Sequence, residues 1–176
     1  MIGLERGVLW LASYQAGWAA EFEAEAKRLR AAMGDRIGPA EHMDSTAIEG
    51  MEAKPIIDIM AAVASLDAAA ARVADLEALG YEWHARDRQD VPDRLYFVHL
   101  TPDGVLVTHH LSLAAQTSQF WQRQLLFRDY LRAHPEARAE YVQLKRELCS
   151  RCQSNRGAYP DAKADFVQRI LKLAKP

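Results

Sequence analysis

Cysteine is scarce in this sequence, since Cys149 and Cys152 are the only two among 176 residues. They form a Cys-Ser-Arg-Cys stretch in a segment with a helical pattern, and no second Cys or His pair lies nearby to complete a four-ligand zinc site. We interpret them as two thiols on a helix face in a reducing compartment. The sequence therefore argues against a zinc or redox site.

Long apolar runs are also missing. No stretch approaches the roughly 20 residues that cross a bilayer. The first 15 residues carry an acid and a base where a secretory signal would have its apolar core. We therefore expect a cytoplasmic protein with no membrane partner.

Excess charge of one sign is small as well. A net charge of −2 and a pI near 6.3 argue against a protein that coats nucleic acid. The charge is nevertheless uneven, because residues 117–176 hold 12 Lys and Arg against 6 Asp and Glu, whereas residues 1–116 hold 10 against 18. This asymmetry favours either an anionic ligand or attachment of the two parts to each other. Among ligands, we expect a phosphorylated small molecule rather than a polymer.

The length and the apolar content bound the architecture. A chain of 176 residues with 49% hydrophobic residues can bury one ordinary core and is short for two. We predict a single domain over residues 1–176, with an α/β core in 1–116 and C-terminal helices in 117–176.

Hydrophobic periodicity predicts the individual elements. Apolar residues three or four apart predict a helix, whereas alternation bounded by Gly, Pro and Asp predicts a strand. The predicted helices cover 15–33, 67–79, 120–133, 135–152 and 159–174, and the predicted strands cover 37–43, 55–63, 81–85, 94–100 and 105–114.

Asp58 is the most unusual residue of the predicted strand 55–63. Alternation places Ile57 and Ile59 on one face and leaves Asp58 on the other, where a carboxylate needs compensation if it is buried. It either lies at a solvated rim or caps a loop, or it holds a divalent cation. If Asp58 holds a cation, Ser45 and Thr46 in the turn before the strand would cradle a phosphate beside that cation.

The strand 105–114 offers a second polar face. Thr108, His110 and Ser112 alternate with apolar residues, so they would line a cleft with Asp58 if the two strands are neighbours. His110 is then either an ordinary hydrogen-bonded histidine, or a metal ligand or proton-transfer group near neutral pH. His109 belongs to the apolar face and is predicted to be structural.

These residues belong to a longer pattern that resembles the GrpB family. The family signature reads approximately EH-[VI]-GSTS-[VI]-x-G-x-x-AKPIIDI, and further similarity covers nearly the whole chain. The matching positions are Glu41, His42, Ser45, Thr46, Gly50, Ala53 to Ile59, Thr108 to Leu111, Phe127 to Glu136, Tyr141, Lys145, Tyr159, Lys163 and Phe166.

The resemblance implies an α/β (α+β) fold, with a nucleotidyltransferase-like mixed sheet, flanking helices and a C-terminal helical layer, related to the polymerase beta superfamily. The hallmark of that superfamily is a Gly-Ser turn followed by a strand that carries two acids. Three departures bear on chemistry here. Asp44 replaces the Gly of the turn, Met60 stands where the second metal carboxylate would fall, and Ser112 replaces the second His of a His-Leu-His strand.

Four basic residues are candidates for phosphate binding. Lys54 precedes Pro55 and either meets a phosphate or pairs with a nearby Glu in solvent. Arg128 could reach a phosphate bidentately. Lys145 and Lys163 match recurrent family positions and would complete an anion pocket, although a helix-face Lys is usually just solvated.

Three hypotheses follow. The first is a nucleotidyltransferase-like protein in which Ser45 and Thr46 contact phosphate, Lys54 and Arg128 offset its charge, Asp58 holds Mg²⁺, and His110 acts as a further ligand or acid–base group. The second is a ligand-binding or interaction protein that keeps the fold without catalysis. The third, a module assisting coenzyme A metabolism, rests on the fusion of GrpB-like domains to dephospho-CoA kinase in some proteins. The sequence predicts no oligomeric state.

Overall fold

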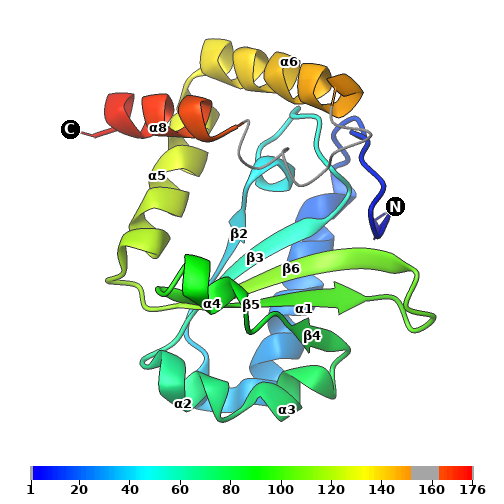
Figure 1. Cartoon of the computed structure of the whole chain (residues 1–176), viewed down its shortest axis with the longest axis vertical. Coiled ribbons are helices and arrows are strands. Elements are labelled where there is room, and N and C mark those ends of the chain that lie inside the picture. Colours follow the sequence, from blue (N-terminus) through cyan, green and yellow to red (C-terminus); the bar gives the residue numbers. More distant parts are fainter. Residues whose placement is uncertain (1, 152–162, 176) are drawn as a thin grey trace.

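The computed structural model describes residues 2–151 and 163–175. Its centre is a mixed sheet in the order β2-β3-β6-β5-β4, with β1 pairing to β6 (Figure 1). β3 and β6 run parallel, and the other neighbours are antiparallel. The strands are β1 (Leu4–Glu5), β2 (Ala40–Met43), β3 (Ile57–Ala62), β4 (Tyr81–Trp83), β5 (Arg94–Leu100) and β6 (Leu106–Ala114).

The helices cover both faces and one end of this sheet (Figure 1). α1 crosses behind the sheet, whereas α5, α6 and α8 form a separate C-terminal group. The helices are α1 (Gly17–Met33), α2 (Leu66–Ala70), α3 (Val73–Glu77), α4 (Asp87–Asp90), α5 (Gln119–Ala133), α6 (Pro135–Arg151) and α8 (Ala164–Leu173), with 3₁₀ turns at Gly34–Arg36 and Ser45–Ala47. The predicted α/β class with C-terminal helices is confirmed.

The single helix predicted for 67–79 is wrong, because the structure has two short helices there. Ser65 caps α2 by accepting a hydrogen bond from the Ala68 N–H at 3.3 Å. Arg72 then leaves helical geometry at φ −115° and ψ 18°, and its Nε donates to Asp75 at 2.6 Å. A high content of Ala favoured a continuous helix, but the backbone leaves helical geometry at Arg72, between the two short helices. The elements β1 and α4 were not predicted.

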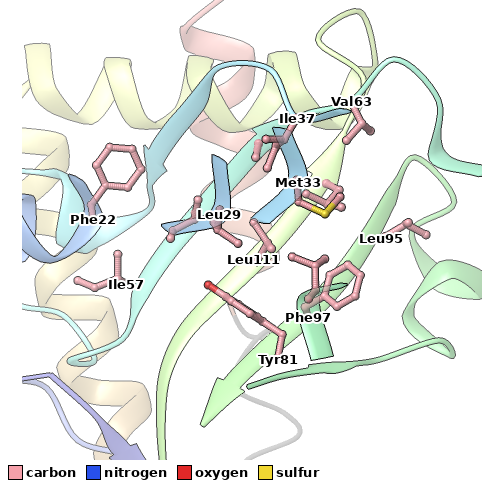
Figure 2. Packing of buried hydrophobic residues seen from close by; sticks show 14 of the residues in the cluster. Phe22, Leu29, Met33, Ile37, Ile57, Val63, Tyr81, Leu95, Phe97 and Leu111 are labelled. Atoms are coloured by element: carbon pink, nitrogen blue, oxygen red, sulfur yellow. The ribbon is translucent and has the colours of Figure 1, made fainter. Parts of the chain in front are cut away.

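One face of the sheet forms the main core with α1. Phe22, Leu29 and Met33 of α1 pack against Ile57 and Leu111 of the two parallel strands (Figure 2). The spacing of four and three residues along α1 brings its apolar side chains onto one face of the helix. The predicted burial of Ile57, Ile59, Leu111 and Leu113 on a common side is therefore confirmed. The prediction that Thr108 shares the cleft face with His110 is wrong, because the β5–β6 register shifts beside it and Thr108 contacts His99 and His109 instead.

The other face is covered only in part. Trp121 of α5 packs on Met60 and Ala114 at one end of this face. A separate cluster joins the turn after β2 to the C-terminal helices, where Ile48 and Met51 contact α5, α6 and α8 residues. The sheet between these two packed regions carries polar side chains.

No helix within the described ranges is both long enough and apolar enough to cross a membrane.

Candidate functional site

Asp58 and His110 lie side by side on the partly covered face. They are register partners on the parallel strands β3 and β6, so the condition under which the sequence predicted a shared cleft is met. The Asp58 carboxylate oxygen Oδ1 lies 2.9 Å from Nδ1 of His110. Their side chains are 33% and 27% exposed, and both line a cavity of about 410 Å³. The acid and the imidazole thus face one opening.

The hydrogen bond between them has a chemical consequence. An ionised carboxylate can only accept hydrogen bonds, so Nδ1 of His110 carries the proton of this contact. In a neutral imidazole the other nitrogen, Nε2, then keeps its lone pair. This is the arrangement in which a carboxylate orients a histidine as a general base.

Three lysines from different parts of the chain line the same cavity: Lys54, Lys145 and Lys163. Lys145 is only 2% exposed and reaches the turn after β2 from α6. Its Nζ donates to Ser45 Oγ at 2.9 Å and to the Glu52 carbonyl oxygen. Burial lowers the pKa of Lys145 to about 8, although Asp44 opposes that shift. The cavity thus holds an ammonium that is costly to keep charged.

The pKa of Lys54 is lowered as well. Burial lowers its pKa, and the nearby Lys163 adds to the effect, whereas Asp58 and Asp44 act against it. Cationic groups this close repel one another unless anions lie between them. An anionic ligand would relieve this repulsion.

The turn after β2 departs from a simple phosphate cradle. Asp44 has φ +50°, a left-handed conformation that usually favours Gly. Its carboxylate accepts a hydrogen bond from Ser45 Oγ at 2.8 Å. Burial acts to raise the pKa of Asp44, but Lys163, Lys145 and Ser45 outweigh it, so the pKa is lowered. A carboxylate therefore already interacts with two of the cavity lysines.

Thr46 also lines the cavity, and its hydroxyl is partly engaged. Oγ1 lies 3.0 Å from Nε2 of His42, whose ring stacks on Phe22 at a centroid distance of 4.9 Å. Burial, followed by the charges of Arg132 and Arg128, lowers the pKa of His42 to about 4. His42 is therefore neutral near pH 7, and its contact with Thr46 helps to hold the turn in place.

Arg128 is not brought to the cavity. It is 8% exposed on α5, and its guanidinium donates to Glu41 Oε2 at 2.7 Å and to the His42 carbonyl at 3.1 Å. It also pairs with Asp129. Arg128 thus attaches α5 to β2, and this geometry offers no support for its predicted phosphate contact.

Arg94 and Tyr96 of β5 line the cavity but were missed by the sequence analysis. The Arg94 guanidinium binds both oxygens of Asp87, at 2.7 and 2.8 Å, and lies over the Tyr96 ring at 4.6 Å. Burial, and then the Asp58 charge, raise the pKa of Tyr96. Alternation along 94–100 places both residues on one face, and this signal could have found them.

Metal ligands are few at this site. Within residues 2–151 and 163–175, no group of three or more His, Cys, Asp or Glu side chains could hold an ion. Met60 and Ser112, which are register partners in the same cavity wall, occupy places where acids or imidazoles would add ligands. The residues present fit Mg²⁺ only in the manner in which it usually binds, through one or two carboxylates together with substrate phosphates.

Cys149 lies on α6 and is partly buried. Cys152 lies outside the described residues, as does Tyr159. The interpretation of the two cysteines as plain helix-face thiols therefore stays a prediction.

Comparison with known proteins decides the family. The sequence profile described as GrpB protein matches residues 9–173, which is nearly the whole chain. The chain is a member of the GrpB family. It is 32% identical over 173 residues to the glutamate-rich protein GrpB of Alkalihalophilus pseudofirmus, covering 97% of this chain and 98% of the relative.

A solved GrpB structure has the same architecture. The crystal structure of conserved protein GrpB from Enterococcus faecalis superposes with a TM-score of 0.84 at 29% identity, over 94% of this chain and 96% of that one. The family resemblance and the α/β fold inferred from the sequence are thereby confirmed.

Part of a larger enzyme is also similar. A dephospho-CoA kinase of Mycolicibacterium paratuberculosis is 30% identical over 193 aligned residues, which cover 89% of this chain but 44% of that protein. GrpB-like sequences therefore occur within longer proteins.

Proposed function

We propose that this GrpB protein binds a nucleotide or another phosphorylated small molecule in the cavity between the sheet and the C-terminal helices. The observation that carries the proposal is the convergence of Lys54, Lys145, Lys163 and Arg94 on one cavity that holds two carboxylates, Asp44 and Asp58. The charge of Arg94 is already balanced by Asp87, so the three lysines facing the two carboxylates give the cavity the positive surplus that attracts a phosphate group.

The burial of Lys145 further supports an anionic ligand. Its ammonium is shielded from water, so its charge is stabilised mainly by Ser45, the Glu52 carbonyl and Asp44. A phosphate oxygen beside Nζ would form a charge-assisted hydrogen bond in a site of low dielectric. Ser45 Oγ, which lines the cavity, is a second group within reach of such a ligand.

Nucleotidyl transfer is the further activity that the Asp58 and His110 pair could serve. With Nδ1 bonded to Asp58, Nε2 of His110 can accept the proton of an acceptor hydroxyl as that oxygen attacks phosphorus. The lysines would offset the negative charge that gathers on the leaving phosphate. Mg²⁺, held by Asp58 together with phosphate oxygens of the ligand, would supply further charge stabilisation at phosphorus.

Calorimetric titration tests the binding proposal. We expect Mg-ATP, Mg-CTP or Mg-GTP to bind, and Lys54→Met or Lys145→Met to weaken that binding by about 10- to 100-fold, the value of one charge-assisted hydrogen bond. Lys27→Met, on the exposed face of α1, is the matched control and should bind as the wild type does. Absence of binding by every nucleotide, with and without Mg²⁺, would rule out a nucleotide ligand, and a further failure of ribose 5-phosphate and inorganic tripolyphosphate to bind would refute the proposal.

A ligand-binding protein without catalysis is the second candidate. The electrostatic attraction between Asp44 and the cavity lysines Lys145 and Lys163, together with Met60 and Ser112 in the wall, favours it. Mn²⁺ added with nucleotide separates the two candidates. An enzyme is indicated if metal binds at Asp58 and if pyrophosphate is released by the wild type but not by Asp58→Asn. A binding protein is indicated if metal leaves nucleotide binding unchanged.

The similarity to a dephospho-CoA kinase supports including dephospho-CoA in the titration panel. Binding of this compound in preference to the nucleoside triphosphates would place the chain with coenzyme A metabolism.

A further inference from the structure

A second cavity of about 540 Å³ adjoins the first on the side of the C-terminal helices. Each volume lies within the range of about 300 to 1,000 Å³ that small-molecule sites occupy. The two cavities share the wall residues Asp44, Arg94, Phe120, Gln124 and Lys163. A ligand that enters one can therefore extend into the other.

The walls of the second cavity are more apolar and aromatic. Phe127 and Tyr141 meet edge to face, with ring centroids 5.4 Å apart, and both belong to the buried cluster that joins α5, α6 and α8. Phe120, Val167 and Leu171 extend this apolar wall. Phe127 and Tyr141 are almost completely buried, so they hold the wall rigid from behind. The half-buried Phe120, with Val167 and Leu171, provides the accessible apolar surface against which a planar group can pack.

The charges of the second cavity balance. Arg94, Arg123 and Lys163 are matched in number by Asp44, Asp90 and Asp93 among its lining residues. It therefore lacks the cationic surplus of the first cavity and offers no attraction for another phosphate. Instead, the Asp carboxylates can accept hydrogen bonds from amino groups, and the Gln124 amide can both donate and accept.

We infer that the second cavity binds the aromatic heterocycle of a ligand whose phosphate lies in the first cavity, so that the ligand is a nucleotide and not a sugar phosphate or a polyphosphate. For the phosphate end this rests on the function proposed above. The heterocycle site stands on the rings and the balanced charges of the second cavity.

Two variants separate this site from its surroundings. Val167 and Val142 are both half-buried and pack on the same cluster, but only Val167 is among the residues that line the second cavity. Val167→Phe should fill the cavity, whereas Val142→Phe adds the same bulk elsewhere on the cluster. Thermal unfolding of both variants checks that the fold is kept. The comparison of ligands on the wild type does not depend on either variant.

The ligands are ATP, adenosine, ribose 5-phosphate and inorganic tripolyphosphate, each titrated calorimetrically. We expect ATP to bind at least 10-fold more tightly than tripolyphosphate or ribose 5-phosphate. Val167→Phe should weaken ATP at least 10-fold and leave tripolyphosphate unchanged, and Val142→Phe should change neither. Tripolyphosphate binding as tightly as ATP would overturn the inference while leaving the phosphate site standing.

The adenosine titration distinguishes the two proposals in the other direction. Adenosine binding that is lost in Val167→Phe but kept in Lys145→Met supports the heterocycle site even if tripolyphosphate does not bind. Binding of none of the four ligands, together with absence of binding by Mg-CTP and Mg-GTP, overturns both proposals.

Discussion

Asp44 shows how one residue can change the chemistry of a turn. Where the family pattern has Gly, this chain places a carboxylate at φ +50° that interacts with Lys145 and Lys163. It therefore competes for the cations that a phosphate would use. Asp44→Gly should raise the affinity for phosphate ligands about 10-fold, since removal of like charge beside a bound anion is worth about 1.4 kcal/mol or more.

Asp44→Asn serves as the comparison for this prediction. Asn tolerates the left-handed conformation but carries no charge. Equal gains in calorimetric affinity for both variants would attribute the effect to charge, and an affinity that falls in both would contradict it.

Lys145 predicts a pH dependence at the residue scale. Its pKa of about 8 in the folded protein lies below the ordinary value of 10.5. Between pH 8 and 10.5 the unfolded chain holds this proton while the folded protein releases it, so the contribution of Lys145 to stability rises with pH. Below pH 8 the full cost of burying the charge is present.

Denaturant unfolding at several pH values measures this effect. From pH 8 to 10, the free energy of unfolding of the wild type should rise relative to that of Lys145→Met. The slope of this difference should approach about 1.4 kcal/mol per pH unit. Lys27→Met, an exposed substitution, should run parallel to the wild type. A constant difference between wild type and Lys145→Met would show that Lys145 is not titrating in this window.

At the scale of elements, α5 connects the sheet to both cavities. Ser118, just before the helix, caps it by accepting a hydrogen bond at Oγ from the Trp121 N–H at 3.1 Å. The next residues of the helix include Phe120 and Gln124, which line both cavities. Loss of this cap should loosen the first turn of the helix and, with it, the shared wall.

Ser118→Ala should therefore lower the free energy of unfolding by about 1 kcal/mol. Ser150→Ala, an exposed change near the end of α6, provides the control because Ser150 does not cap a helix start. Chemical denaturation compares the two variants, and an equal effect of both would rule out the role of the cap.

At the scale of the whole molecule, the C-terminal helices and the sheet are joined by a continuous interface. Met51, fully buried, packs in the cluster formed with α5, α6 and α8, while Met33 is equally buried between α1 and the sheet. Polar contacts of Arg128 with Glu41 and of Lys145 with Ser45 cross the same boundary. The prediction of one domain over residues 1–176 then implies cooperative unfolding.

Met51→Ala and Met33→Ala test this cooperativity from either side of the sheet. Each should cost about 2 to 5 kcal/mol, the usual effect of a core Met→Ala change. Each should also keep one transition with the same midpoint by circular dichroism and by Trp fluorescence. Two separate transitions in Met51→Ala would show instead that residues 117–176 unfold on their own.

Sequence periodicity alone determined most of the elements and the neighbourhood of the site. The pattern in 94–100 predicted β5 with the bounds that the structure has, and alternation placed Asp58 and His110 on faces that could meet. These features depend on local geometry, because a strand repeats every two residues and a helix every 3.6.

Only the tertiary structure decided which cations reach the cavity. Arg128 and Lys145 were equal candidates on their helices, yet one is held by Glu41 and the other points at Ser45. Arg94 lies in the same cavity as Asp58 because β6, the hairpin partner of β5, also pairs with β3, and that second pairing is distant in the sequence. Side-chain partners across 50 to 100 residues depend on how the layers pack, and the local pattern of residues carries no information about that packing.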